Sequence, residues 1–92
     1  MTINAGQYIQ WDAVPGAIEY DAELLNAAAG AVLKAVTSED TEVSSVEILE
    51  GQPHGNYNFR VRATDAVGPG AWSILVPIEF NPLPAPGNIR VS

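Results

Sequence analysis

The residues best able to take part in binding or catalysis are charged side chains that recur at every second position. Arg60 and Arg62 are half of the four cations of the chain, and Glu19, Asp21 and Glu23 repeat in the same way in an earlier segment. Alternating residues share one face of a β-strand. If the two strands are neighbours, opposite charges face each other and contribute about 0.2–1 kcal/mol per pair. The alternative is that the arginines bind an acidic partner or a sugar.

The other polar residues give little support for a metal site or a catalytic centre. The acidic turn at 39–42, even with help from Asp12 or Asp65, lacks the glycine-centred spacing of a calcium loop. His54 is the single histidine, cysteine is absent, and no Gly-x-Ser-x-Gly elbow occurs. We therefore expect no catalytic residue, no metal and no cofactor, and we predict that the protein is not an enzyme.

The charge of the chain narrows the classes of partner. Eleven acidic residues against four basic ones give a net charge of −7. This charge repels phosphate backbones and anionic lipids, so we expect neither nucleic-acid binding nor membrane insertion. No apolar run approaches the roughly 18 residues of a membrane span, and no signal-peptide pattern opens the sequence. Ninety-two residues, 47% of them hydrophobic, suit one folded domain.

Alternating apolar and polar residues predict a protein built from short strands. The pattern is clearest at 57–65, where Tyr57, Phe59, Val61 and Ala63 share a face. Turns rich in Gly, Pro, Asn or acidic residues separate the segments, which is typical of a β-sandwich. At 43–49 we expect Val46 and Ile48 to point inward. The six predicted strands cover residues 7–12, 17–24, 31–36, 43–49, 57–65 and 72–80.

The segment 22–36 also fits a different secondary structure. It is rich in Ala and Leu, and Leu24, Ala28, Ala31 and Ala35 would share a helix face. Gly30 in its middle would cost a helix about 1 kcal/mol relative to Ala. Because the preceding alternation runs on to Leu24, we favour a strand, a loop and a second strand.

Several of these residues, in this order, resemble the fibronectin type III family, in particular its prokaryotic or phage-like members. The resemblance covers about residues 6–80 and rests on Trp11, Val14-Pro15-Gly16-Ala17, Tyr20, Leu49, the 57–63 strand and Gly68-x-Gly70-x-Trp72-Ser73. It implies an all-β, immunoglobulin-like sandwich of a three-strand and a four-strand sheet. It also implies that the Tyr57 hydroxyl bonds back to the preceding loop. The core that it implies comprises Trp11, Tyr20, Leu49, Tyr57, Phe59, Val61 and Trp72.

Two features depart from that family pattern. Leu49 precedes Tyr57 by eight residues rather than six, which predicts a longer loop and leaves the hydrogen-bond partner of the tyrosine open. Only Met1–Gly6 precede the second strand. We therefore expect the first strand to be missing or reduced to about Thr2–Asn4.

A Pro-rich tail at 81–92 follows the sandwich domain predicted for 1–80, and its last residues resemble the opening strand of such a domain. It is the start of a following repeat, a strand that folds back, or a strand that pairs with the open edge of a neighbouring molecule. A fold-back must cover roughly 30 Å. Residues 81–87 span at most about 23 Å. We favour a linker in a tandem array and a monomer, with a strand-exchange oligomer as the alternative.

Function is expected at the loops, because sandwich domains bind through loops at one end. Residues 13–16 and 66–71 should meet at one pole. The binding candidates are Val67, Pro69, Arg60, Arg62 and Tyr8. We predict a structural spacer or interaction module of a larger surface, secreted or virion protein such as a phage tail, with protein partners or neighbouring repeats. The alternative is a ligand-binding or glycan-binding module that uses the same loops.

Overall fold

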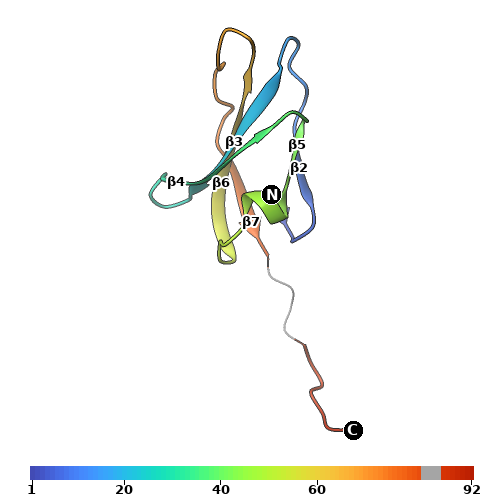
Figure 1. The fold of residues 1–92 in the computed structure, drawn as a ribbon. Helices are drawn as coiled ribbons and strands as arrows, with labels where there is room; N and C mark the ends of the chain where they lie inside the picture. Colours follow the sequence, from blue (N-terminus) through green and yellow to red (C-terminus); the bar gives the residue numbers. More distant parts are fainter. Residues whose placement is uncertain (82–85) are drawn as a thin grey trace.

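The chain forms two facing β-sheets (Figure 1), in a computed structural model that describes residues 1–81 and 86–92. The larger sheet has the order β1-β7-β6-β3-β4, and the smaller pairs β2 with β5. The expected all-β sandwich is therefore confirmed. Its elements are β1 (Thr2–Ile3), β2 (Tyr8–Gln10), β3 (Glu19–Asn26), β4 (Val32–Ser38), β5 (Glu42–Ser44), the one-turn helix α1 (Ser45–Ile48), β6 (Gly55–Thr64) and β7 (Val76–Phe80).

The segment that also fitted a helix is a strand, a loop and a strand. β3 pairs antiparallel with β4 on one side and with β6 on the other. The loop between β3 and β4 is closed by Asn26, whose Oδ1 accepts hydrogen bonds from the backbone N–H groups of Ala28 (2.8 Å) and Ala29 (3.0 Å). Gly30 has φ of 70°, a left-handed conformation that suits glycine and does not belong in a helix. The helix alternative is wrong.

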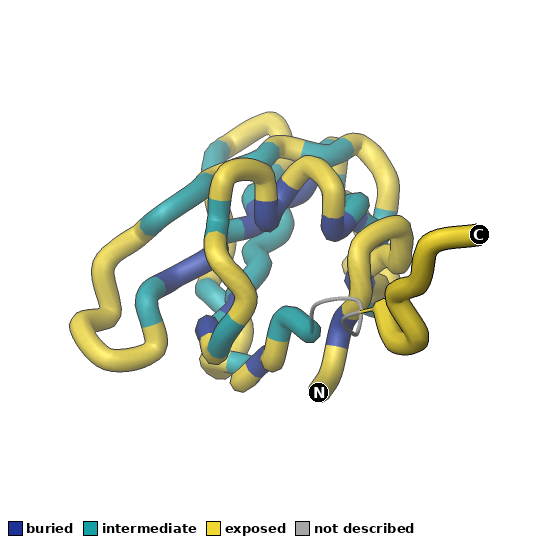
Figure 2. Tube along the Cα trace, turned by 90° about the horizontal axis from the view of Figure 1, so that it is seen from below, coloured by how far each residue is buried: buried dark blue, intermediate teal, exposed yellow. Residues whose placement is uncertain are grey.

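The core lies between the sheets, on the faces that the alternation predicts. Ala22, Leu24 and Phe59 cover the inner face of the larger sheet, opposite Ile9 and Val43 of the smaller one. Seen from below, the trace shows buried positions on the strands and exposed residues along the loops at the periphery (Figure 2). Each fully buried Leu or Phe contributes about 1.5–3 kcal/mol through its removal from water.

The predicted strand at 43–49 is only three residues long. β5 ends at Ser44, and α1 follows at once with Ser44 as its N-cap, whose Oγ accepts from Val46 N at 3.2 Å. Ser44 and Glu47 have the spacing of a capping box, a helix-start signal that competes with alternation. The change of period leaves Val46 63% exposed, contrary to expectation, while Ile48 is buried as predicted.

The last predicted strand is also shorter than expected. β7 begins at Val76, so residues 72–75 are not a strand. Ser73 replaces regular pairing there: its N–H donates to Val61 O (2.8 Å), and its Oγ accepts from Val61 N (3.1 Å). A side chain thus takes the place of a backbone acceptor, and the following Ile74 is 83% exposed.

The first strand is present and short, and it joins the larger sheet instead of lying beside β2. β1 runs parallel to β7, with Thr2 opposite Glu79 and Ile3 opposite Phe80. The turn that follows is held against α1 by Ser45, whose Oγ donates to Asn4 O (3.1 Å) and accepts from Gly6 N (2.9 Å). This turn directs β1 to the opposite sheet. The expected three-plus-four division of strands is therefore wrong.

The C-terminal residues carry no regular structure. Residues 86–92 are exposed and extend away from the sandwich (Figure 1), and Ile89 and Val91 are 91% and 100% exposed. Residues 82–85 of the predicted linker lie outside the described residues.

Candidate interaction site

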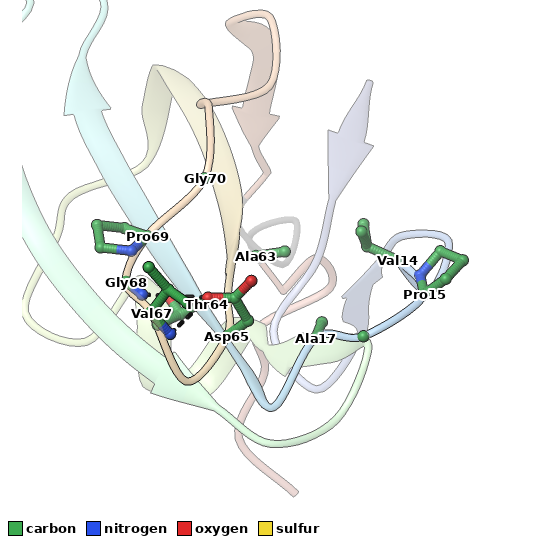
Figure 3. A pocket seen from close by; sticks show the side chains of 11 residues that line it. Val14, Pro15, Ala17, Ala63, Thr64, Asp65, Val67, Gly68, Pro69 and Gly70 are labelled. Carbon is green, nitrogen blue, oxygen red and sulfur yellow. Dashed lines mark hydrogen bonds between the residues drawn. The ribbon is translucent and has the colours of Figure 1, made fainter.

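Two loops meet at one pole of the sandwich and enclose a hollow of about 460 Å³ (Figure 3). The first loop connects β2 to β3 and the second connects β6 to β7, as predicted for residues 13–16 and 66–71. The hollow is lined by Val14, Pro15, Gly16, Ala17, Ala63, Thr64, Asp65, Val67, Gly68, Pro69 and Gly70. Two predicted binding residues, Val67 and Pro69, therefore lie in one site.

The second loop is held in a fixed shape by Asp65. Its Oδ1 accepts from the backbone N–H groups of Val67 (2.8 Å) and Gly68 (3.1 Å), and its own N–H donates to Gly68 O (3.1 Å). The N–H of Gly70 donates to Ala63 O at 2.8 Å, which returns the chain to β6. A Cβ at Gly70 would lie 3.2 Å from that carbonyl oxygen, so the close approach favours glycine.

The first loop is anchored to the larger sheet. Val14 N donates to the hydroxyl of the buried Tyr20 at 2.8 Å, and Ala17 N closes a turn to Val14 O at 3.1 Å. Ile18 N donates to Thr64 O at 2.8 Å, which joins this loop to the base of the second. Both walls of the hollow are thus preorganised, which lowers the entropy lost on binding.

This hollow, which we call the pole site, presents apolar side chains at the tips of both loops. Val67 is 97% exposed at the tip of its loop and Val14 is 49% exposed across from it. Asp65 is the one charged lining residue, and its Oδ1 already accepts two backbone N–H groups. The Thr64 Oγ1 is buried and has no hydrogen-bond partner among the described residues. The site thus combines apolar contact area at its two tips with polar groups at its base.

Arg60 and Arg62 lie away from the pole, on the outer face of the larger sheet. Arg60 pairs with Glu23 (Nη2 to Oε1, 2.6 Å) and Arg62 with Asp21 (Nε to Oδ2, 3.0 Å). The strand register places these residues directly opposite each other, which confirms the predicted cross-strand pairing. Both guanidinium groups are occupied by carboxylates, so the pairs serve strand register.

Trp72 was expected in the core and lies instead against this outer face. The guanidinium carbons of Arg60 and Arg62 are each 4.3 Å from the centre of its ring, and the residue is only half-buried. The irregular path of residues 72–75 places the indole there. Two cations and one aromatic ring thus form a layer, which we call the Arg-Trp stack, over strands β3 and β6.

The other predicted core residues lie in or beside the core. Tyr20, Leu49, Tyr57 and Phe59 are buried, and the partly buried Trp11 and Val61 pack against the cluster. Trp11 contacts the rings of Tyr20 (centroids 5.6 Å apart) and Phe59 (6.1 Å).

Tyr57 has the hydrogen bond that the family resemblance implied, and its partner is now identified. Its hydroxyl donates to the carbonyl oxygen of Pro53 in the preceding loop. Burial raises the pKa of the Tyr57 phenol, because desolvation disfavours the phenolate. The neutral phenol is therefore the form that this site holds.

Tyr8 is separate from the pole. It lies on β2 of the smaller sheet and is 58% exposed. The five predicted binding residues thus occupy three surfaces: Val67 and Pro69 lie at the pole, Arg60 and Arg62 on the outer face of the larger sheet, and Tyr8 on the smaller sheet. Ala63 and Thr64 also line the hollow at the pole. The sequence did not predict this, because their segment was interpreted only as a strand.

Three observations concern other kinds of function. Within residues 1–81 and 86–92, no group of three or more His, Asp or Glu side chains is placed to hold a metal ion. In the same residues, no helix has the length and apolar character needed to cross a membrane. Comparisons with protein-family models, curated proteins and solved structures gave no match. The resemblance to fibronectin type III domains therefore stays a prediction.

Proposed function

We propose that the chain is a non-catalytic structural and interaction module of fibronectin type III type, which contacts a protein partner through the pole site. The observation that carries the proposal is a hollow with two apolar tips, Val14 and Val67, on loops fixed by internal hydrogen bonds. A rigid apolar surface of this kind suits a protein contact, which excludes water from apolar area without ordering new loops.

The same chemistry favours a protein over a glycan. Carbohydrate sites use aromatic faces for stacking and free polar groups for hydroxyls. The lining of the pole site contains no aromatic residue, and one oxygen of its single carboxylate is engaged by backbone N–H groups. Glycan binding is the second candidate, and its support comes from exposed Tyr8 on another surface.

The biological setting follows by analogy with small sandwich modules in general. We propose a secreted, cell-surface or virion protein, phage tails included, in which such modules act as spacers or attachment units. The net charge of −7 suits solubility and disfavours anionic partners.

The proposal is tested by partner capture with matched variants. Immobilised wild type, Val67→Asp and Val46→Asp are incubated with the secreted and envelope fractions of the source cells, and bound proteins are quantified by mass spectrometry. Val46 is 63% exposed on α1 and controls for an added surface charge. We expect a partner that wild type and Val46→Asp retain and Val67→Asp loses. A partner retained equally by all three contradicts a role for the pole.

The glycan alternative is tested on a glycan array. Retention of wild type that Tyr8→Ala abolishes and Val67→Asp leaves unchanged would replace the proposed protein contact by the second candidate. Absence of retention at high protein concentration removes the glycan candidate.

A further inference from the structure

The outer edge of β2 lacks a neighbouring strand. The smaller sheet contains only β2 and β5 among the described residues, because β1 pairs with β7 instead. The ladder bonds Trp11 N to Thr41 O (3.0 Å) and Ser45 N to Gln7 O (2.8 Å) point residues 7 and 11 toward β5. By the alternation of an antiparallel ladder, the backbone N–H and C=O groups of Tyr8 and Gln10 point to the free edge.

The opposite edge of the smaller sheet is protected. The carbonyl of Glu42 in β5 accepts a hydrogen bond from Ser38 Oγ (3.0 Å), and β5 ends in α1 after three residues. An incoming strand would have to displace that bond and pass the helix. The edge of β2 is therefore the accessible one for strand addition.

Two hollows lie along this free edge, where an added strand would place inward side chains. One, of about 370 Å³, is bounded by β1 on one side and Gln7–Gln10 on the other. The second, of about 390 Å³, lies between Trp11 and the segment 71–73 and is mostly apolar. The indole Nε1 of Trp11, beside the second hollow, is buried and has no hydrogen-bond partner in the described residues.

The C-terminal residues have the chemistry of the missing strand. Ile89 and Val91 are two residues apart and almost fully exposed, so in an extended strand both would point to the same face. Arg90 between them is the single charged residue after Glu79 and would point outward. The exposed Asp12, which follows the end of β2, carries a charge that complements it. The tail extends away from its own sandwich (Figure 1).

From these observations we infer that residues 88–92 of one molecule add as an antiparallel strand to the free edge of β2 in a second copy of this chain. Arg90 pairs with Gln10, which places Ile89 beside Trp11 and Val91 beside Ile9. Backbone bonds supply affinity and the two hollows supply specificity, as in β-strand addition generally. Because donor and acceptor surfaces differ, the contact is head-to-tail and extends into chains of molecules.

The test uses one variant that lacks the donor and one that lacks the acceptor. The donor-deficient chain is Ile89→Asp/Val91→Asp. The acceptor-deficient chain is Gln10→Pro, which removes an N–H from the free edge and leaves the ladder to β5 intact. Sedimentation velocity of full-length wild type from 20 µM to about 1 mM should show an average mass that rises to at least twice the 9.7 kDa of one chain.

Each variant alone should stay monomeric, and their equimolar mixture should form a dimer because each supplies what the other lacks. Far-UV circular dichroism checks that both variants fold. A wild type that stays monomeric at about 1 mM overturns the inference, as does association that both variants retain. A monomer whose Trp11 indole N–H resonance shifts in the Ile89→Asp/Val91→Asp chain shows a fold-back within one molecule and also overturns it. Val67 plays no part here, so the result is independent of the pole site.

Discussion

Removal of the Trp72 side chain should lower the free energy of unfolding by a moderate amount that depends on two arginines. In the Arg-Trp stack, Arg60 and Arg62 each lie 4.3 Å from the ring centre. A cation–π contact at a partly exposed site contributes about 0.5–1 kcal/mol. The indole is half-buried, and loss of that apolar contact costs about 1 kcal/mol more. We expect Trp72→Ala to cost about 2–3 kcal/mol in total.

The interaction energy between Trp72 and each arginine distinguishes a loss of cation–π contacts from a loss of core packing. In a double-mutant cycle with Arg62→Met, which keeps an apolar stem and removes the charge, the interaction energy with Trp72 should be about 0.5–1 kcal/mol. The cycle with Arg60→Met should give a similar value, since the two distances are the same.

The measurement is urea unfolding at 25 °C, followed by far-UV circular dichroism and by fluorescence. The chain has two tryptophans, so Trp11 remains as the fluorescent probe in every Trp72 variant. Leu75→Ala is the matched control, because Leu75 is 50% exposed in the same irregular segment and should cost less than about 1 kcal/mol.

Two results would refute the reasoning. Interaction energies within about 0.5 kcal/mol of zero for both arginines would show that the stack does not form. A loss of about 4–5 kcal/mol without coupling would place Trp72 in the core, where the sequence alone had put it.

Three further predictions address the core, the buried phenol and the pole. Leu24→Ala should cost about 3–5 kcal/mol in urea unfolding, since Leu24 is completely buried. Tyr57→Phe should cost about 1 kcal/mol at pH 7, because the Pro53 carbonyl loses its donor. The raised pKa of Tyr57 means that wild-type stability falls as pH rises above 10.0, where the unfolded chain ionises first; the variant should fall less. Asp65→Ala should lower the ¹⁵N heteronuclear NOE of residues 66–68 and leave β6 unchanged.

Each of these has an outcome that contradicts it. A Leu24→Ala cost no larger than that of Leu75→Ala would mean that the two sheets do not pack as described. Equal pH dependence of wild type and Tyr57→Phe between pH 10 and 12 would show that the phenol is not desolvated. Unchanged NOE values in Asp65→Ala would mean that the loop is ordered by other contacts.

Long alternating segments predicted most of the fold correctly. β3 and β6 are long enough for the period of two to be unambiguous, and the cross-strand charges confirmed which strands are neighbours. The errors lie where a local signal competes with that period. The N-cap at Ser44 begins a helix where the alternation predicts a strand, and the Ser73 side chain takes the place of a backbone acceptor ahead of β7.

The candidate site was only partly predictable. Turn residues identified both loops of the pole, but the closeness of Ile18 to Thr64 arises from sheet geometry and has no signature in the residues. The prediction for Trp72 was wrong for a different reason: the family resemblance implied a core position, whereas the contact of its ring with two cations depends on strand register. The sequence could also not predict which sheet β1 joins, because this depends on the hydrogen bonds by which Ser45 holds the turn after β1.

The parallel pairing of β1 and β7 determines how the domain would carry mechanical load. The carbonyls of Met1 and Ile3 accept hydrogen bonds from Glu79 N (2.8 Å) and Asn81 N (3.0 Å), so the first and last strands are joined side by side. A force that pulls the two ends of the domain apart acts along both strands and shears these bonds together, instead of opening them one at a time. Resistance to stretching would therefore reside in this short seam, and the rest of the sandwich would feel no tension until the seam gives way.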